Sequence, residues 1–186
     1  MASSTLSNFK GSLPFGGARP SLFEMTVSAP STIGDFDDMK THCNVSAIPP
    51  LTVTPIERQY FGRTVKIPGD MVFGDLNTTI INSENFSIRN DIDDWMNAMN
   101  THVKILGFSD NTSWAGSLTL TQYSKDGDSL MSWTFVDAWP QTVAEIALSY
   151  DTASDIEQYD VTWAYNYYTS VKGKSTHLDS TFAKQI

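Results

Sequence analysis

The residues whose types and spacing could support chemistry are few. Cys43 lies beside His42, the pair from which a thiol nucleophile and its base are built. The surrounding segment is predicted to be a strand, in which neighbouring side chains point to opposite faces. The two side chains therefore cannot act together, and we interpret Cys43 as a small buried residue.

Metal and nucleotide sites are also unsupported. His42, His102 and His177 lie in unrelated contexts, and the sequence has neither an HxxxH nor a CxxC spacing. Asp126 and Asp128 resemble the start of a calcium loop, but the glycine falls between them instead of at the sixth position, which favours a turn. No GxSxG, P-loop or GxGxxG pattern occurs. The sequence predicts no enzyme activity, no catalytic residue, no metal and no cofactor.

Composition narrows the classes of protein further. The 186 residues suit one domain, and a hydrophobic content of 40% supplies a core. The net charge of −9 disfavours specific nucleic-acid binding, because an acidic chain gains nothing from phosphates. With one cysteine, no secretory signal and no apolar run of about 20 residues, the sequence predicts a cytosolic protein that does not insert into a membrane.

Strands dominate the elements that would position any site. Apolar and polar residues alternate in several stretches, the longest at residues 158–167. Strands are predicted over 22–27, 41–47, 118–123, 130–138 and 158–167. Residues 61–82 are predicted to form a hairpin that turns at Pro68-Gly69-Asp70, and Trp139-Pro140 is expected to end the strand before it.

One helix is predicted over residues 84–99. Its apolar stripe has the spacing of an amphipathic helix packed on a core, and Ser83 or Asn85 would cap it. The stripe consists of Ile88, Ile92, Trp95, Met96 and Met99. The predicted fold is therefore mainly β, an antiparallel sandwich or barrel of about seven strands with one flanking helix at about 84–99.

The chain divides into three predicted parts. Residues 1–19 form an N-terminal arm, residues 20–170 form the β-domain, and residues 171–186 form a C-terminal tail. Within the domain, residues 48–60 form an extended excursion rich in proline, and long excursions of this kind tend to be functional.

Four stretches of the sequence carry a resemblance. They are Ala18–Phe23 (ARPSLF), Cys43–Pro49 (CNVSAIP), Gly69–Leu76 (GDMVFGDL) and Trp139–Asp151 (WPQTVAEIALSYD), the last of which is the most specific. In this order, over about residues 18–168, they resemble the tail tube protein family of contractile-tailed bacteriophages. That family is related in fold to the tube protein of type VI secretion systems.

The resemblance implies a structural virion protein. Its subunits would close into hexameric rings that stack into a hollow conduit for delivering genomic DNA to the host. It implies further partners: a tail sheath outside, baseplate and tail-terminator proteins, and a tape-measure protein, then DNA, in the lumen. The chain would be assembled in the host cytoplasm and located in the virion tail.

Inter-subunit contacts are predicted from the excursion, extended to residues 48–71, and from the N-terminal arm and the C-terminal tail. Arg58, Arg63 and Lys66 gather positive charge in an acidic chain, which favours pairing with the carboxylates of a neighbour. Phe9 and Phe15 are apolar anchors in the N-terminal arm. We expect these five residues to contact neighbouring subunits.

Alternative functions remain open on the sequence alone. A type VI secretion-like subunit or a baseplate tube-initiator would share the same fold and the same signals. A carbohydrate-binding β-sandwich is a further alternative, with Trp114, Trp133 or Tyr168 as a surface platform.

Overall fold

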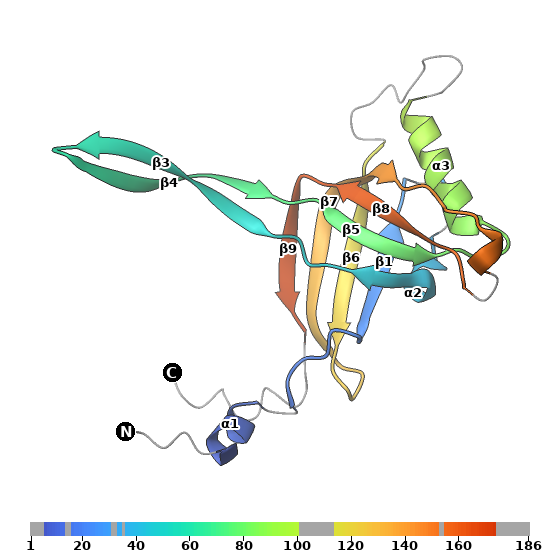
Figure 1. The fold of residues 1–186 in the computed structure, drawn as a ribbon, viewed down its shortest axis with the longest axis horizontal. Coiled ribbons are helices and arrows are strands. Elements are labelled where there is room, and N and C mark those ends of the chain that lie inside the picture. Colours follow the sequence, from blue (N-terminus) through green and yellow to red (C-terminus); the bar gives the residue numbers. More distant parts are fainter. Residues whose placement is uncertain are drawn as a thin grey trace.

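The computed structural model describes residues 6–13, 16–30, 33–34, 36–100, 114–152 and 155–173, which fold mainly as antiparallel strands (Figure 1). The strands are β1 (Phe23–Ser28), β2 (Cys43–Ser46), β3 (Leu51–Tyr60), β4 (Arg63–Phe73), β5 (Leu76–Ile81), β6 (Gly116–Tyr123), β7 (Ser129–Val143), β8 (Gln158–Ala164) and β9 (Tyr167–Lys172). The helices are α1 (Leu6–Ser12), α2 (Met39–His42) and α3 (Ser87–Met99), with a 3-10 turn, η2, at Tyr150–Thr152.

Two layers share strand β7. One layer has the order β1-β6-β7-β9, and the other has the order β7-β8-β5-β2. All pairings are antiparallel, and the buried side chains of both layers meet between them. The prediction of a mainly β, antiparallel sandwich or barrel is confirmed, with nine strands among the described residues in place of about seven.

Strand β7 changes layer at Asp137. Residues 131–136 pair with β9, whereas residues 139–143 pair with β8. Asp137 lies between them with φ 55°, a left-handed conformation that turns the strand. The prediction that Trp139-Pro140 ends the strand is wrong. From Trp139 onward β7 pairs with β8 alone, and an edge tolerates the missing N–H of Pro140.

The predicted strand 158–167 is two strands. β8 ends at Ala164 and β9 begins at Tyr167, because the chain crosses from one half of β7 to the other. The Asn166 N–H donates to the Val136 carbonyl at 3.1 Å during this crossing. β9 ends at Lys172, beyond the predicted domain end at residue 170.

The predicted hairpin over 61–82 is also wrong. The hairpin is formed by β3 and β4, and it turns at Phe61 and Gly62, whose φ values are 45° and 73°. Two residues with positive φ make the turn whose twist matches a hairpin. Pro68-Gly69-Asp70 lies inside β4, where Pro68 pairs with Pro55 and the register shifts by a bulge.

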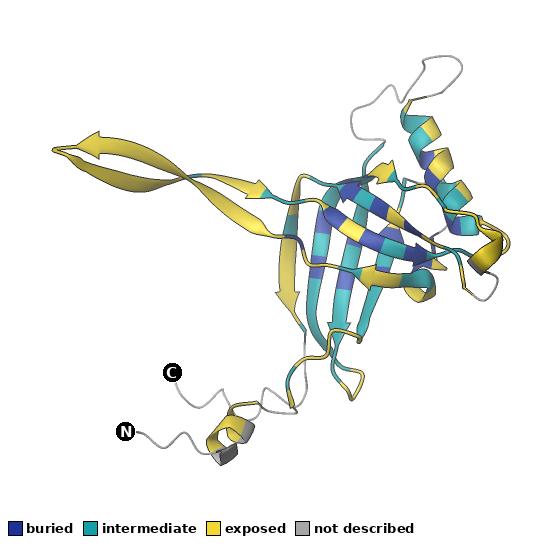
Figure 2. Cartoon of the chain, in the orientation of Figure 1, coloured by how far each residue is buried: buried dark blue, intermediate teal, exposed yellow. Residues whose placement is uncertain are grey.

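Helix α3 covers one end of the layers, as the apolar stripe predicted. Ile88, Ile92 and Trp95 are buried, while the acidic side faces solvent (Figure 2). The helix begins at Ser87, three residues later than predicted, because Phe86 takes a left-handed conformation. Phe86 occupies the N-cap position without a side-chain cap hydrogen bond, so neither Ser83 nor Asn85 is the cap; Asn85 Oδ1 accepts the Ser87 N–H at 3.2 Å from the position before it.

Candidate assembly surface

The β3–β4 hairpin extends away from the two layers (Figure 1). All of β3 is exposed, and so is β4 apart from Gly69 and Phe73 (Figure 2). A two-stranded hairpin without a packed face is marginally stable in water. The hairpin therefore lacks a partner within the described part of this chain.

Large apolar side chains cover the hairpin. They are Leu51, Val53, Ile56, Tyr60, Phe61, Val65, Ile67, Met71 and Val72, and each is exposed by at least 45%. Exposed apolar side chains in such number on one element are typical of interaction sites. Sequence reasoning missed these residues, since alternation looks the same in a half-buried strand and in a strand exposed on both faces.

The root of the hairpin is fixed by aromatic packing. The Phe73 ring lies 5.4 Å from that of Tyr168 and 6.3 Å from that of Tyr165, both edge-on. The Gly74 N–H donates to the Pro50 carbonyl at 3.0 Å, and the Tyr165 hydroxyl donates to the Gly74 carbonyl. Burial raises the pKa of Tyr165 to about 12, so this hydroxyl remains a donor at neutral pH. The hairpin thus projects from a rigid base.

The register divides the outer half of the hairpin into two faces, because cross-strand partners in an antiparallel pair share a face. We call one the cationic face, formed by Ile56, Arg58, Tyr60, Arg63, Val65 and Ile67. We call the other the paired face, formed by Pro55, Glu57, Gln59, Thr64, Lys66 and Pro68. The two faces differ in chemistry.

The predicted contact residues are only partly brought together. Arg58 and Arg63 lie on the cationic face, while Lys66 lies on the paired face, 3.2 Å from Glu57 Oε1. Phe9 is 63% exposed on α1, apart from the hairpin (Figure 1), and Phe15 lies outside the described residues. That these five residues contact neighbouring subunits stays a prediction.

Cys43 and His42 are not hydrogen-bonded to each other, and the two do not alternate along one strand as predicted. His42 ends α2 and Cys43 begins β2, so the two do not share a strand. His42 Nδ1 lies 2.9 Å from the Asp38 carbonyl oxygen. Burial raises the pKa of Cys43 to about 12, which keeps this partly buried thiol protonated.

The Asp126–Asp128 stretch forms a turn, as its spacing predicted. The Ser124 hydroxyl accepts the N–H groups of Asp126 and Asp128, and Gly127 has φ 88°. Across the described residues, no group of three or more His, Cys, Asp or Glu side chains is placed to hold a metal. His102 and His177 lie outside those residues.

The three aromatic residues of the carbohydrate-binding alternative do not lie together on an open surface, because Trp133 is buried. Trp133 is 8% exposed and belongs to the core. Tyr168 packs on Phe135 and Phe73, and Trp114 packs edge-on against Trp139. Trp114 and Tyr168 are partly buried against these rings. In the described part of the chain, no helix is long and apolar enough to cross a membrane.

A two-layer β-domain with one covering helix is a fold that recurs in contractile injection systems. The fold is similar to a chain of the PVC sheath–tube complex of an extracellular contractile injection system (18% identity, TM-score 0.59, 91% of this chain and 99% of that one). It is also similar to a chain of the anti-feeding prophage tube-terminating cap (16% identity, TM-score 0.63, 83% and 91%). At these identities the likeness concerns the fold.

The chain belongs to the phage tail tube protein family, whose sequence model matches residues 4–171. It is 25% identical to the tail tube protein gp19 of Enterobacteria phage T4 over 152 residues, 81% of this chain and 90% of that protein. It is 24% identical to the tail tube protein of Serratia phage KSP90 over 179 residues, 92% and 98% of the two chains. The resemblance carried by the four sequence stretches is confirmed. The chain is a structural tail tube protein.

Proposed function

We propose that this protein assembles with itself into hexameric rings that stack into a hollow tube. The observation that carries the proposal is the β3–β4 hairpin, whose apolar side chains are exposed on both faces. The edge strands add support, since Val45 on β2 and Val171 on β9 are also exposed. Open sheet edges are an aggregation hazard unless a neighbour covers them.

The tube conducts genomic DNA into the host and has no catalytic step. The sheath lies outside it, baseplate and tail-terminator proteins close its ends, and the tape-measure protein precedes DNA in its lumen. The tail-assembly partners are supported by neighbours in fold that come from a sheath–tube complex, a tube terminator, a tube cap and a baseplate. Assembly takes place in the host cytoplasm.

The lumen is lined mainly by acidic side chains. A hexameric ring carries 6 × (−9) = −54 formal charges. A wall rich in Lys and Arg would retain DNA through counterion release, whereas an acidic wall repels phosphates. Only charges within about 8 Å of the bore act on DNA at physiological salt. A bore lined mainly by Lys and Arg in the assembled tube contradicts this arrangement.

Negative-stain microscopy with sedimentation velocity tests the proposal. The purified full chain is expected to form rings and tubes as its concentration rises, because each copy offers hairpins and edges that only another copy covers. Sedimentation at the 20.6 kDa monomer mass across the whole concentration range contradicts self-assembly. A Leu51→Ser/Ile67→Ser variant, which lowers the apolar surface of the hairpin, is expected to assemble less readily.

A further inference from the structure

The two faces of the β3–β4 hairpin differ in whether their polar side chains have partners within the chain. On the paired face, Lys66 pairs with Glu57 at 3.2 Å and Gln59 Nε2 donates to Thr64 Oγ1 at 2.9 Å. On the cationic face, Arg58 and Arg63 have neither an ion pair nor a hydrogen bond to any described residue. The cationic face therefore carries two unmatched guanidinium groups.

Apolar side chains surround these two guanidinium groups. Ile56, Val65 and Ile67 are exposed by 46–48%, and Tyr60 by 67%. A surface that combines planar cations with aliphatic and aromatic groups fits a partner that offers carboxylates beside apolar side chains. The partner of the cationic face is therefore expected to present carboxylates and apolar side chains together.

The opposite end of the same chain offers that chemistry. We call residues 145–151 and 155–157 the acidic end. Its exposed apolar side chains are Leu148 at 81%, Tyr150 at 103% and Ile156 at 68%. Its exposed carboxylates are Glu145, Asp151 and Asp155, which form no ion pair with a described residue.

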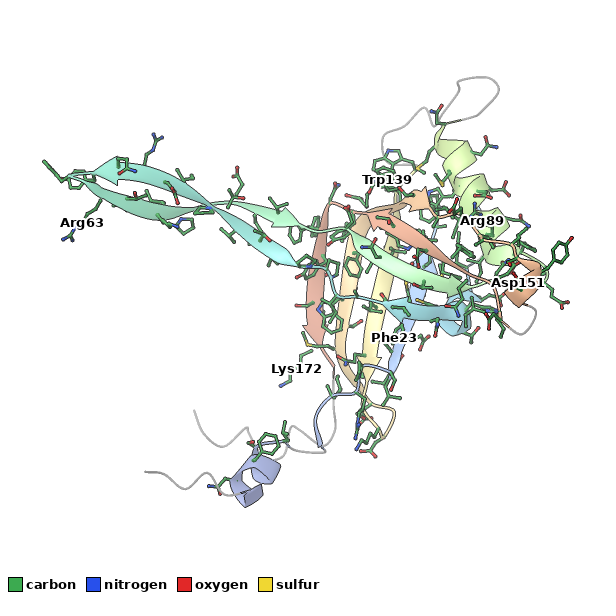
Figure 3. The ribbon with its side chains drawn as sticks, in the orientation of Figure 1. Phe23, Arg63, Arg89, Trp139, Asp151 and Lys172 are labelled. Carbon is green, nitrogen blue, oxygen red and sulfur yellow. The ribbon has the colours of Figure 1, made fainter. Side chains whose placement is uncertain are left out.

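The cationic face and the acidic end lie far apart within one chain. Figure 3 places Arg63 near the tip of the hairpin and Asp151 at the other extreme of the molecule's longest axis. The 10 residues of β3 span about 34 Å at roughly 3.4 Å per residue, so the tip reaches well beyond its own layers. The two surfaces can meet only between copies.

We propose that the cationic face of one copy docks on the acidic end of a second copy. Arg58 and Arg63 pair with carboxylates among Glu145, Asp151 and Asp155, while the apolar groups of both surfaces exclude water. This contact joins two different patches, so it is head-to-tail and repeats from copy to copy. It rests on the proposed self-assembly and assigns one of its interfaces.

Charge reversal on each surface separately tests this contact. One variant, Arg58→Glu/Arg63→Glu, makes the cationic face negative, and a second, Asp151→Arg/Asp155→Arg, makes the acidic end positive. Each alone places like charges at the interface, so each is expected to raise the protein concentration needed for assembly about tenfold or more. All four side chains are exposed, so the chain is expected to fold normally.

Mixing the two variants gives the decisive readout. In a 1:1 mixture the hairpin of each variant meets an oppositely charged end on the other, so assembly is expected to recover. The matched control is Glu57→Lys/Lys66→Glu, which swaps the ion pair of the paired face and is expected to assemble like the unmodified chain.

Two outcomes overturn the assignment. In the first, the variants assemble normally on their own. In the second, each variant fails and the mixture fails as well. Neither outcome removes the proposed self-assembly, which the unmodified chain tests by itself in sedimentation.

Discussion

Asn166 donates a hydrogen bond from Nδ2 to Asp137 Oδ2 at 2.8 Å, across the corner where β7 passes from one layer to the other. Asp137 needs φ 55° to turn the strand, and Asn166 lies where the chain crosses between β8 and β9. The bond therefore joins the two positions at which the layers exchange strands.

Substitution at this corner separates backbone strain from the hydrogen bond. Asp137→Val is expected to lower the free energy of unfolding by roughly 2–3 kcal/mol, because a β-branched residue resists positive φ and cannot accept the bond. Asp137→Asn, the matched control, tolerates the conformation and retains an acceptor, so it is expected to cost less than about 1 kcal/mol. Urea unfolding below the assembly concentration measures both. Equal losses for the two variants would show that the conformation of residue 137 is unimportant.

Trp95 is expected to be the most sensitive position of α3. Its side chain is fully buried, its ring lies 6.0 Å from that of Trp163, and its Nε1 donates to the Trp114 carbonyl at 2.9 Å. Trp95→Ala should lower the free energy of unfolding by about 3–5 kcal/mol through the cavity and the lost bond. Asp94→Ala on the exposed side of the same helix should change it by less than about 0.5 kcal/mol. Comparable losses at both positions would contradict the packing of this helix.

Tyr159 is expected to make the stability of the domain fall at alkaline pH. Burial is the main cause that raises its pKa from 10.0 to about 12, and its hydroxyl is buried without a hydrogen-bond partner among the described residues. Its contribution to stability is full below pH 10 and is lost as pH rises through about 12, because the unfolded chain releases this proton more readily.

Tyr159→Phe should therefore flatten the loss of stability between pH 10 and 12. It should also raise the free energy of unfolding at pH 7 by roughly 1 kcal/mol, since it removes an unsatisfied buried hydroxyl. Tyr167→Phe, at a ring that is 46% exposed, is the control and should leave stability at pH 7 unchanged. Urea unfolding as a function of pH measures both variants. An unchanged alkaline limb for Tyr159→Phe contradicts the assignment.

Cys43 should react slowly with disulfide reagents in the folded chain. A pKa of about 12 leaves a thiolate fraction at pH 8 roughly a thousandfold smaller than that of a thiol of pKa 9.0. A Cys43→Ser/Ser28→Cys variant carries its thiol at an exposed position and should react at an ordinary rate. Rapid labelling of native Cys43 would show that the thiol is accessible and ionised.

Sequence patterns predicted the elements in which the spacing of apolar residues alone decides which face is buried. The stripe of Ile88, Ile92 and Trp95 placed α3, and the alternation of Leu118 and Leu120 placed β6, because each face packs on one core. Patterns failed where pairing between distant residues decides the conformation. The alternation over 158–167 predicts one continuous strand. The break between β8 and β9 arises because they pair with different halves of β7.

The sequence indicates that the hairpin carries positive charge, but it does not indicate which of its residues share a face. The positive residues of the proline-rich excursion stood out against an acidic chain. Which of them share a face depends on the register, and the register depends on a turn at Phe61-Gly62 that the stronger Pro-Gly signal obscured. Nothing in the sequence indicates that the acidic end is an exposed surface, because Leu148 and Tyr150 are residue types that usually lie in a core.

A cryo-EM reconstruction of the tube assembled from the unmodified chain tests most directly whether the β3–β4 hairpin joins neighbouring copies. We expect stacked rings in which the cationic face of each β3–β4 hairpin is buried, with Arg58 and Arg63 against Leu148, Tyr150 and the carboxylates of a neighbouring copy. Hairpins that project into solvent, with Tyr60 and Phe61 exposed as they are in the single chain, would contradict it.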